Sequence, residues 1–210
     1  GVLLTLLAGL DRPTRGHVEV NDRPVEGPGP ERLLIFQDGG LFPWLSVREN
    51  VEFGLNLRRL PAPERKKRVE RLIELVRLTG FEDARVHQLS GGMRQRAALA
   101  RGLAMEPGLL LMDEPFAALD AQTRDRLGVE LQQIWSETGQ TIVFITHNLR
   151  EAACLGDRVL VMSHRPGRLI RELAIDLPRP RRIEDEGLIE SVRPIMADLR
   201  HEVAAAEAAR

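Results

Sequence analysis

Cysteine, net charge and long apolar segments are all scarce in this chain, and each scarcity excludes a class of protein. A single cysteine, Cys154, allows no internal disulfide and fits a reducing compartment. The net charge of −1 gives no general attraction to nucleic acid. The apolar stretch at the start, residues 2–10, is too short to cross a bilayer and has no basic segment before it. Any role at a membrane must therefore be peripheral.

What the chain does contain is the composition of an ordinary globular protein. Hydrophobic residues make up 43% and charged residues 29%, which excludes disordered and fibrous classes. A length of 210 residues suffices for one substantial core with a smaller subdomain. The chain shows no internal repeat, and biased composition is confined to its alanine-rich end.

The chain is organised around the stretch Leu109–Pro115. Four apolar residues are followed by Asp113, Glu114 and Pro115, a pattern that predicts a buried strand ending abruptly in two carboxylates. In a mostly parallel sheet with helices on both faces, ligands bind outside the carboxyl ends of the strands. We therefore expect Asp113 and Glu114 to hold a metal ion and a water molecule at this edge.

A second candidate site lies at the start of a helix expected from about Met93 to Ala104. The residues before it are Ser90, Gly91 and Gly92, which present unshielded backbone N–H groups, a hydroxyl and the positive end of the helix dipole. Such an arrangement suits an anion, in particular a phosphate. A serine-glycine-glycine triplet by itself is typical of an ordinary loop, but the Arg-Gln-Arg run after it and the acidic strand at the expected distance favour a binding site.

Two further polar residues follow predicted strands. Gln37 comes directly after a predicted strand at residues 33–36, and His147 after one at residues 141–146. Because the carboxyl ends of parallel strands meet at one edge, the side chains of Gln37, Asp113 and His147 are expected to converge on one crevice.

The remaining segments predict helices around this sheet. Ser46 and Glu49 form a capping box at the start of one helix, and residues 64–78 have a single apolar face. We expect these helices to form a subdomain, about residues 46–106, inserted in an α/β domain of residues 1–182. Residues 183–210 are expected to form a helical tail.

The loop after Gln37 carries Phe42 and Trp44, which is unusual for a solvated turn. Either these side chains plug the core or they line a groove that faces a partner. The sequence leaves both readings open.

Taken together, Gln37, the Ser90 triplet, the acidic strand and His147 resemble the nucleotide-binding subunit of an ABC transporter in their order and spacing. The resemblance covers essentially the whole chain and implies a P-loop NTPase-like ABC ATPase core that uses ATP and Mg2+. In such a subunit Gln37 reaches the metal and senses the membrane partner. The resemblance further implies that Asp113 holds magnesium mainly through water, Glu114 polarises the attacking water and His147 contacts the terminal phosphate.

The same resemblance implies several partners. Ser90, Gly91 and Gly92, with Asp120 of the D-loop, would act on ATP held by the opposite subunit of a head-to-tail dimer. Integral-membrane permease subunits are expected to bind the dimer at the cytoplasmic face of the membrane, with an extracytoplasmic solute-binding protein as an indirect partner and no nucleic acid. Several segments of the chain are similar to the importer group for nitrate, sulfonate, taurine and bicarbonate. These segments are residues 42–51, 162–168 and 176–181.

One departure from the family concerns the phosphate loop. In the family, the helix that begins near Leu3 follows a glycine-rich loop ending in Gly-Lys-Ser-Thr, whose backbone and lysine hold the phosphates. Gly1 and Val2 stand here where the Ser-Thr pair would be. We therefore expect an amino-terminal truncation, with the activity belonging to the intact parent and this chain by itself not binding ATP normally.

Two other functions stay open. A soluble ABC-type ATPase of DNA repair, translation or cluster assembly would share these motifs, but it usually shows a long coiled-coil insertion, a tandem cassette or a basic face. The sequence shows none of these. A non-catalytic regulatory module is favoured only by the missing phosphate loop.

Overall fold

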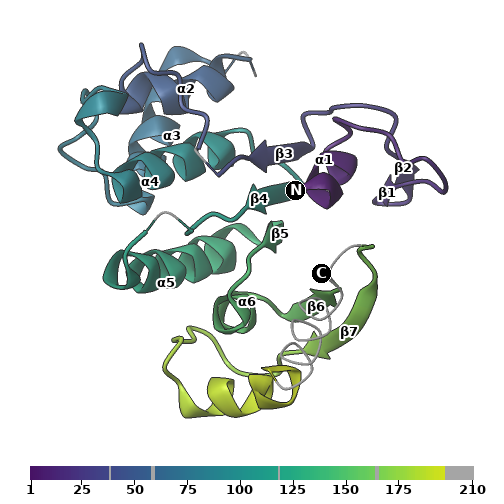
Figure 1. The fold of residues 1–210 in the computed structure, drawn as a ribbon. Coiled ribbons are helices and arrows are strands. Elements are labelled where there is room, and N and C mark those ends of the chain that lie inside the picture. Colours follow the sequence, from purple (N-terminus) through teal and green to yellow (C-terminus); the bar gives the residue numbers. More distant parts are fainter. Residues whose placement is uncertain (38, 58–59, 118, 164–165, 197–210) are drawn as a thin grey trace. The chain divides into compact units, whose positions relative to one another are not determined.

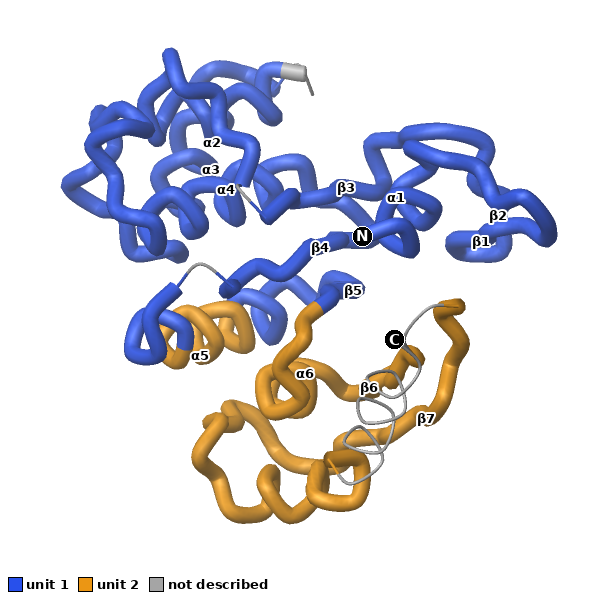
Figure 2. Tube along the Cα trace, in the orientation of Figure 1, with its two compact units in different colours: residues 1–124, 134–145 blue, residues 125–133, 146–210 orange. Residues whose placement is uncertain are grey.

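A computed structural model describes residues 1–37, 39–57, 60–117, 119–163 and 166–196. The chain forms two compact units, which Figure 2 colours separately. Unit 1 comprises Gly1–Arg124 and Ile134–Ile145, and unit 2 comprises Asp125–Gln133 and Thr146–Arg210.

Three parallel strands form the sheet of unit 1. They are β3 (Arg32–Ile35), β4 (Leu109–Asp113) and β5 (Thr141–Ile145), with β4 in the centre (Figure 1). The first four residues of β4 are buried, as its apolar run predicts. Residue Ile35 of β3 pairs with Met112, and Asp113 pairs with Ile145 of β5. The predicted parallel α/β sheet is therefore confirmed.

Helices cover both faces of this sheet. Successive side chains of a strand point to opposite faces, so neighbouring residues of β3 pack against different helices. Leu34 belongs to a cluster with Leu111 and with Leu4 of α1 (Val2–Leu7). Leu33 and Ile35 lie instead against Gly102 of α4 (Gly91–Ala104).

The helical insertion lies between β3 and β4. It contains α2 (Val47–Leu57), α3 (Ala62–Leu75), the short 3-10 helix η1 (Val86–Gln88) and α4, and the three longer helices contact one another (Figure 1). The capping box at the start of α2 is confirmed, because the Ser46 N–H donates to Glu49 Oε2 at 2.6 Å and the Glu49 N–H donates to Ser46 Oγ at 3.2 Å. The boundaries of the inserted subdomain stay a prediction.

Before the insertion, β1 (Glu19–Val20) and β2 (Arg23–Pro24) form a short antiparallel hairpin. Its turn residues Asn21 and Asp22 have φ values of 52° and 58°, as a tight two-residue turn requires.

Unit 2 combines several helical segments with a two-stranded antiparallel sheet. The sheet pairs β6 (Arg158–Met162) with β7 (Leu169–Ala174), and α6 (Leu149–Leu155) precedes it. The long helix α5 (Ala121–Thr138) contributes its middle residues to this unit. Residues 186–196 are helical, in agreement with the expected helical tail, whose remainder lies outside the described residues.

A buried arginine fastens the segment that follows β7 to the rest of unit 2. Arg181 is 4% exposed, and its guanidinium donates to the carbonyls of Ala153 at 3.1 Å and Gly156 at 2.6 Å. Its backbone N–H donates to Gln132 Oε1 at 2.8 Å, and its carbonyl accepts from Gln132 Nε2 at 2.9 Å. Burial lowers the pKa of Arg181. The sequence gives no periodic signal for this contact, because Arg181 follows the prolines of an irregular segment.

The close packing of α4 on β3 makes a prediction for Gly102. A Cβ at this position would lie 2.9 Å from Leu33 Cδ2 and 3.1 Å from Ile35 Cδ1. We expect Gly102→Val to lower the free energy of unfolding by about 1–3 kcal/mol, measured by urea denaturation, because overpacking forces these side chains to shift. The control is Gly128→Ala in α5, where the Cβ would make an ordinary 3.7 Å contact. An unchanged stability of the Gly102 variant would contradict this packing.

Candidate functional site

Two acidic residues stand at the carboxyl end of β4, the central strand of the sheet. Asp113 is the last residue of β4 and is half-buried, and its Oδ2 contacts the amino group of Gly1. Glu114 follows with a φ of 46°, and its N–H donates to the Ile145 carbonyl of β5 at 2.9 Å. A glutamate in the left-handed region costs about 1–3 kcal/mol and persists only where surrounding contacts hold it. The fold therefore fixes the backbone of Glu114 in a strained conformation directly beside Asp113.

Gln37 leaves the neighbouring strand at the same edge. Gln37 is the second residue after Ile35, the last residue of β3, and Glu114 is the second residue after Met112. The register of the sheet pairs Ile35 with Met112. Gln37 is exposed. The structure thus places the residues after β3 and β4 at one edge of the sheet, as the sequence predicts.

His147 follows β5 by two residues in the chain and belongs to unit 2, where its side chain is exposed. The next residue, Asn148, caps α6 by accepting hydrogen bonds from the backbone of Arg150 and Glu151. The predicted convergence of His147 with Asp113 stays a prediction.

A magnesium ion would find few protein ligands at the end of β4. Within the described part of the chain, no group of three or more His, Cys, Asp or Glu residues could hold a metal ion. Mg2+ commonly takes only one or two carboxylates and completes its shell with water and substrate phosphates. The donor set of Asp113 and the Gln37 amide therefore fits a magnesium ion that is held jointly with a phosphate.

The start of α4 is a capped helix start, where the sequence predicts an anion site. Ser90 is the N-cap, and its Oγ accepts from the Met93 N–H at 3.2 Å. Gly91 and Gly92 are the first two helical residues and differ in their surroundings. A Cβ on Gly92 would lie 2.8 Å from Thr123 Cγ2, whereas a Cβ on Gly91 would meet nothing within 4 Å. Gly92 is needed for packing within the chain, and Gly91 leaves an open surface at the helix start.

The start of α5 lies against the start of α4. Asp120 caps α5 by accepting from the Thr123 N–H at 3.0 Å, and the methyl group of Thr123 is the one that faces Gly92. The hydrogen bond from the Thr123 backbone, with a further one from its side chain, lowers the pKa of Asp120. The structure therefore brings the start of α4, with Gly92, against the start of α5, which Asp120 caps.

Both helix starts share one supporting contact. Arg94 donates to the Leu89 carbonyl at 2.7 Å, and Arg124 donates to the Leu119 carbonyl at 2.9 Å. Each arginine stands four residues after its cap and binds the carbonyl just before that cap. This repeated contact fixes the direction in which the chain enters each helix.

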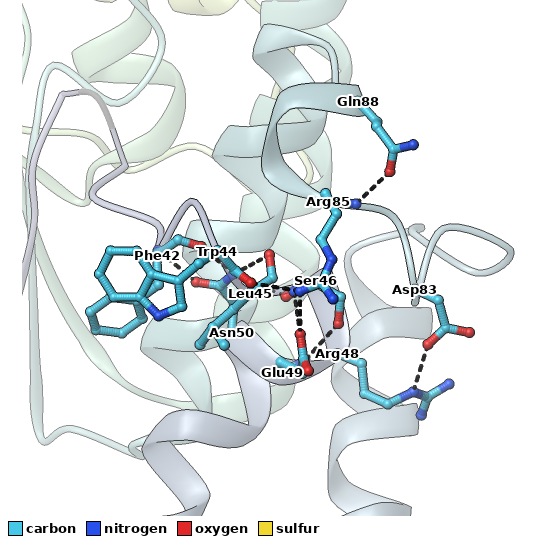
Figure 3. A network of polar contacts seen from close by, with 10 residues as sticks. All are labelled: Phe42, Trp44, Leu45, Ser46, Arg48, Glu49, Asn50, Asp83, Arg85 and Gln88. Carbon is cyan, nitrogen blue, oxygen red and sulfur yellow. Dashed lines mark hydrogen bonds and ion pairs between the residues drawn. The ribbon is translucent and has the colours of Figure 1, made fainter.

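The loop after Gln37 is anchored by two polar residues that sequence reasoning missed. Arg101 of α4 donates to the carbonyls of Gly40 at 2.6 Å and Gly39 at 3.0 Å, and its guanidinium lies 5.4 Å from the Phe42 ring centre. Burial lowers the pKa of Arg101. Asn50 is fully buried, accepts from the Phe42 N–H at 2.9 Å and donates to the Phe42 carbonyl at 3.2 Å (Figure 3). The sequence signal for the Arg101 contact was an arginine among the small residues of α4.

The aromatic side chains of this loop do not plug the core. Trp44 is 69% exposed, Phe53 of α2 is also exposed, and Phe42 is half-buried. The Phe42 ring centre lies 5.6 Å from that of Trp44 and 4.6 Å from that of Phe53. The structure thus shows an exposed aromatic cluster, Phe42–Trp44–Phe53, next to the loop that contains Gln37.

Across the described residues, no helix is both long and apolar enough to span a membrane.

Solved structures share this fold. The chain matches the ATP-binding cassette MJ0796, solved as a dimer with ADP and Pi, at a TM-score of 0.70 and 29% identity over 84% of this chain and 81% of that one. It also matches cbiO1 of Clostridium perfringens, part of the ABC transporter complex cbiONQ, at a TM-score of 0.75 and 27% identity over 95% and 82% of the two chains. The fold is that of an ABC ATPase cassette.

Sequence comparisons show the family. Residues 1–117 match the family model described as ABC transporter. An uncharacterized ABC transporter ATP-binding protein, MJ0412, of Methanocaldococcus jannaschii is 48% identical over 96% of this chain and 75% of its own length. The taurine import ATP-binding protein TauB of Burkholderia thailandensis is 47% identical over 84% of this chain and 68% of its own. The chain belongs to the ABC transporter ATP-binding family.

The lowered pKa of Asp120 makes a prediction about pH. A carboxylate whose pKa is depressed by folding stabilises the protein above its usual pKa, and this contribution is lost as the pH falls through the depressed value. Asn is an equally good N-cap without a charge. We therefore expect wild type to lose more stability than Asp120→Asn on acidification below the usual aspartate range, measured as urea midpoints at a series of pH values. The control is Asp83→Asn, at an exposed carboxylate that caps no helix. Parallel pH profiles for wild type and Asp120→Asn would contradict the prediction.

Proposed function

We propose that this chain is the ATP-hydrolysing subunit of an ABC importer for a small solute. The observation that carries the proposal is the end of β4, where Asp113 lies beside Glu114 in a strained conformation with φ 46°. Strained residues cluster at catalytic sites, because surrounding contacts pre-organise the reacting group. The family membership supports ATP as the substrate.

Each predicted site residue has a role in this proposal. Asp113 and Gln37 hold a magnesium ion, which supplies charge neutralisation for the phosphates. Glu114 accepts a proton from the attacking water, and the ordered backbone keeps its carboxylate in one place. His147 donates a hydrogen bond to the terminal phosphate. Phosphoryl transfer requires positioning and electrostatic stabilisation and little covalent chemistry from the protein, and these side chains would supply part of both.

The start of α4 acts on a second subunit. Ser90, Gly91 and Gly92 with Asp120 would meet ATP bound by the partner of a head-to-tail dimer. The open surface at Gly91 supports this role, since no described residue lies within 4 Å of a Cβ built there. MJ0796 was solved as a dimer, which supports pairing of two subunits.

The chain requires a phosphate-binding loop to complete the ATP site. Residues 1–210 contain no Gly-Lys pair of the kind that ends such a loop. We propose that these 210 residues alone are inactive. A non-catalytic regulatory module is the alternative, and it would be favoured if a chain extended with its own upstream residues neither bound nor hydrolysed ATP.

The cargo is proposed to be a small anion of the nitrate, sulfonate, taurine and bicarbonate group. Relatives that are named taurine import ATP-binding proteins, 47% to 49% identical, support this assignment. The subunit would work at the cytoplasmic face of the membrane, bound to permease subunits that receive cargo from an extracytoplasmic solute-binding protein. The exposed cluster Phe42–Trp44–Phe53 beside the Gln37 loop is the proposed docking surface for the permease.

Substitution of Glu114 tests the catalytic proposal. In a chain that carries its phosphate loop, Glu114→Gln should lower the rate of ATP hydrolysis about 100- to 10,000-fold, because the general base is lost, while ATP stays bound. Phosphate release measures the rate, and size-exclusion chromatography with ATP should show a trapped dimer. The control, Glu64→Gln in the first turn of α3, should hydrolyse ATP normally. A variant of Glu114 with wild-type turnover would refute the assignment.

Substitution of the docking surface tests the transporter proposal. Phe42→Ala with Trp44→Ala should separate ATP hydrolysis from taurine uptake in proteoliposomes, since the aromatic contact area for the permease is removed. The matched control is Phe81→Ala, which removes another exposed aromatic ring outside the cluster. Uptake and assembly at wild-type levels would contradict the docking surface, and a wild type that takes up none of nitrate, sulfonate, taurine and bicarbonate would contradict the cargo.

A further inference from the structure

Two segments far apart in the sequence are joined beside the aromatic cluster. The Val47 N–H donates to the Ala84 carbonyl at 3.0 Å, and the Arg48 N–H donates to the Glu82 carbonyl at 2.8 Å. Ser46 and Arg85 form an isolated antiparallel bridge. The first segment leads from Trp44 into α2, and the second leads through η1 to the Ser90 cap of α4. These bonds therefore connect the exposed aromatic loop to the chain that enters the signature helix.

The side chain of Arg85 completes this connection (Figure 3). Its Nη1 donates to the Trp44 carbonyl at 2.6 Å and to Glu49 Oε2 at 2.9 Å. The same Glu49 oxygen accepts from the Ser46 N–H at 2.6 Å, so the arginine, the capping box and the Trp44 backbone form one network. A planar guanidinium can hold a carbonyl and a carboxylate at once in a fixed geometry.

The network orients the Trp44 loop more than it stabilises the fold. Arg85 and Glu49 are both 46% exposed at their side chains, and exposed ion pairs contribute little to the free energy of unfolding. Trp44 projects into solvent from a loop, and its indole contacts the Phe42 ring at 5.6 Å between centres. The direction of the indole therefore depends on how its backbone is held, and Arg85 holds the Trp44 carbonyl.

The Arg85 backbone extends the connection towards α4. Its N–H donates to Gln88 Oε1 at 2.7 Å, and the next residue, Leu89, presents its carbonyl to Arg94 of α4. We propose that Arg85 is a positioning residue that holds Trp44 for the membrane subunit and ties it to the segment that enters the signature helix. This inference rests on the proposed function, because it uses the permease as the partner of Trp44.

The first test follows Trp44 in the isolated protein and does not depend on a partner. The chain has two tryptophans, Trp44 and Trp135, so Trp135→Phe leaves Trp44 as the sole reporter. In that background Arg85→Gln should lower the fluorescence anisotropy of Trp44 and increase its quenching by acrylamide, because its carbonyl is released. The matched control is Arg48→Gln, which removes the same charge from an arginine that pairs with Asp83 at 3.6 Å and does not contact Trp44. Equal anisotropy of Trp44 in the Trp135→Phe background with and without Arg85→Gln would overturn the inference.

The second test measures binding of the full-length subunit to its own membrane subunits in nanodiscs. Arg85→Gln should weaken binding by about tenfold, the size expected for loss of one hydrogen bond to a charged group, and Arg48→Gln should not. If Arg85 acts through Trp44, the Arg85→Gln, Trp44→Ala double variant should bind no more weakly than Trp44→Ala alone. A merely structural role would make the two effects additive and would overturn the inference.

The outcomes separate this inference from the function on which it rests. Normal binding by Trp44→Ala would overturn the docking surface and the Arg85 inference together. Weakened binding by Trp44→Ala with normal binding by Arg85→Gln would overturn the Arg85 inference alone. A wild-type complex that assembles without hydrolysing ATP would refute the proposed ATPase, while the binding comparison would still decide the role of Arg85.

Discussion

The position of the candidate site depends on the parallel pairing of β4 between its two neighbours. Leu110 and Leu111 point to opposite faces of the sheet and both are fully buried, so β4 is held by packing on both sides. The register of this pairing places the residues after β3 and after β4 at one edge. The strained backbone of Glu114 also depends on it, because the Glu114 N–H bonds to the Ile145 carbonyl of β5. The packing and register of β4 thus determine where the carboxylates of Asp113 and Glu114 lie.

The starts of α4 and α5 form the second part of the candidate site, and both are built in the same way. Ser90 and Asp120 each cap a helix through a hydrogen bond three residues on, and an arginine four residues after each cap binds the carbonyl before it. The two starts meet where Gly92 faces Thr123, and a side chain at Gly92 would not fit there. Backbone N–H groups and helix dipoles at such starts suit phosphate binding without a dedicated charged side chain.

Polar contacts hold the loops that connect these parts. Arg101 fixes the glycines after Gln37, Asn50 fixes Phe42, and Arg85 fixes Trp44. Loops have no ladder of backbone hydrogen bonds, so their carbonyls need partners from side chains. These contacts explain how an exposed aromatic cluster keeps a defined shape at the surface.

The sequence by itself determined the elements and the chemistry of their ends. The apolar run before Asp113 predicted a buried strand, Ser46 with Glu49 predicted a cap, and the Ser90 triplet predicted a helix start, because each depends on neighbours within a few residues. Only the tertiary structure decided which residues meet. Gly92 packs on Thr123, and Arg101 and Arg85 each donate hydrogen bonds to a loop carbonyl. The exposure of Trp44 was likewise decided by the tertiary structure. Such contacts join positions up to 62 residues apart, and no local pattern records them. Local propensities choose the elements, whereas packing and hydrogen bonding between elements choose the partners.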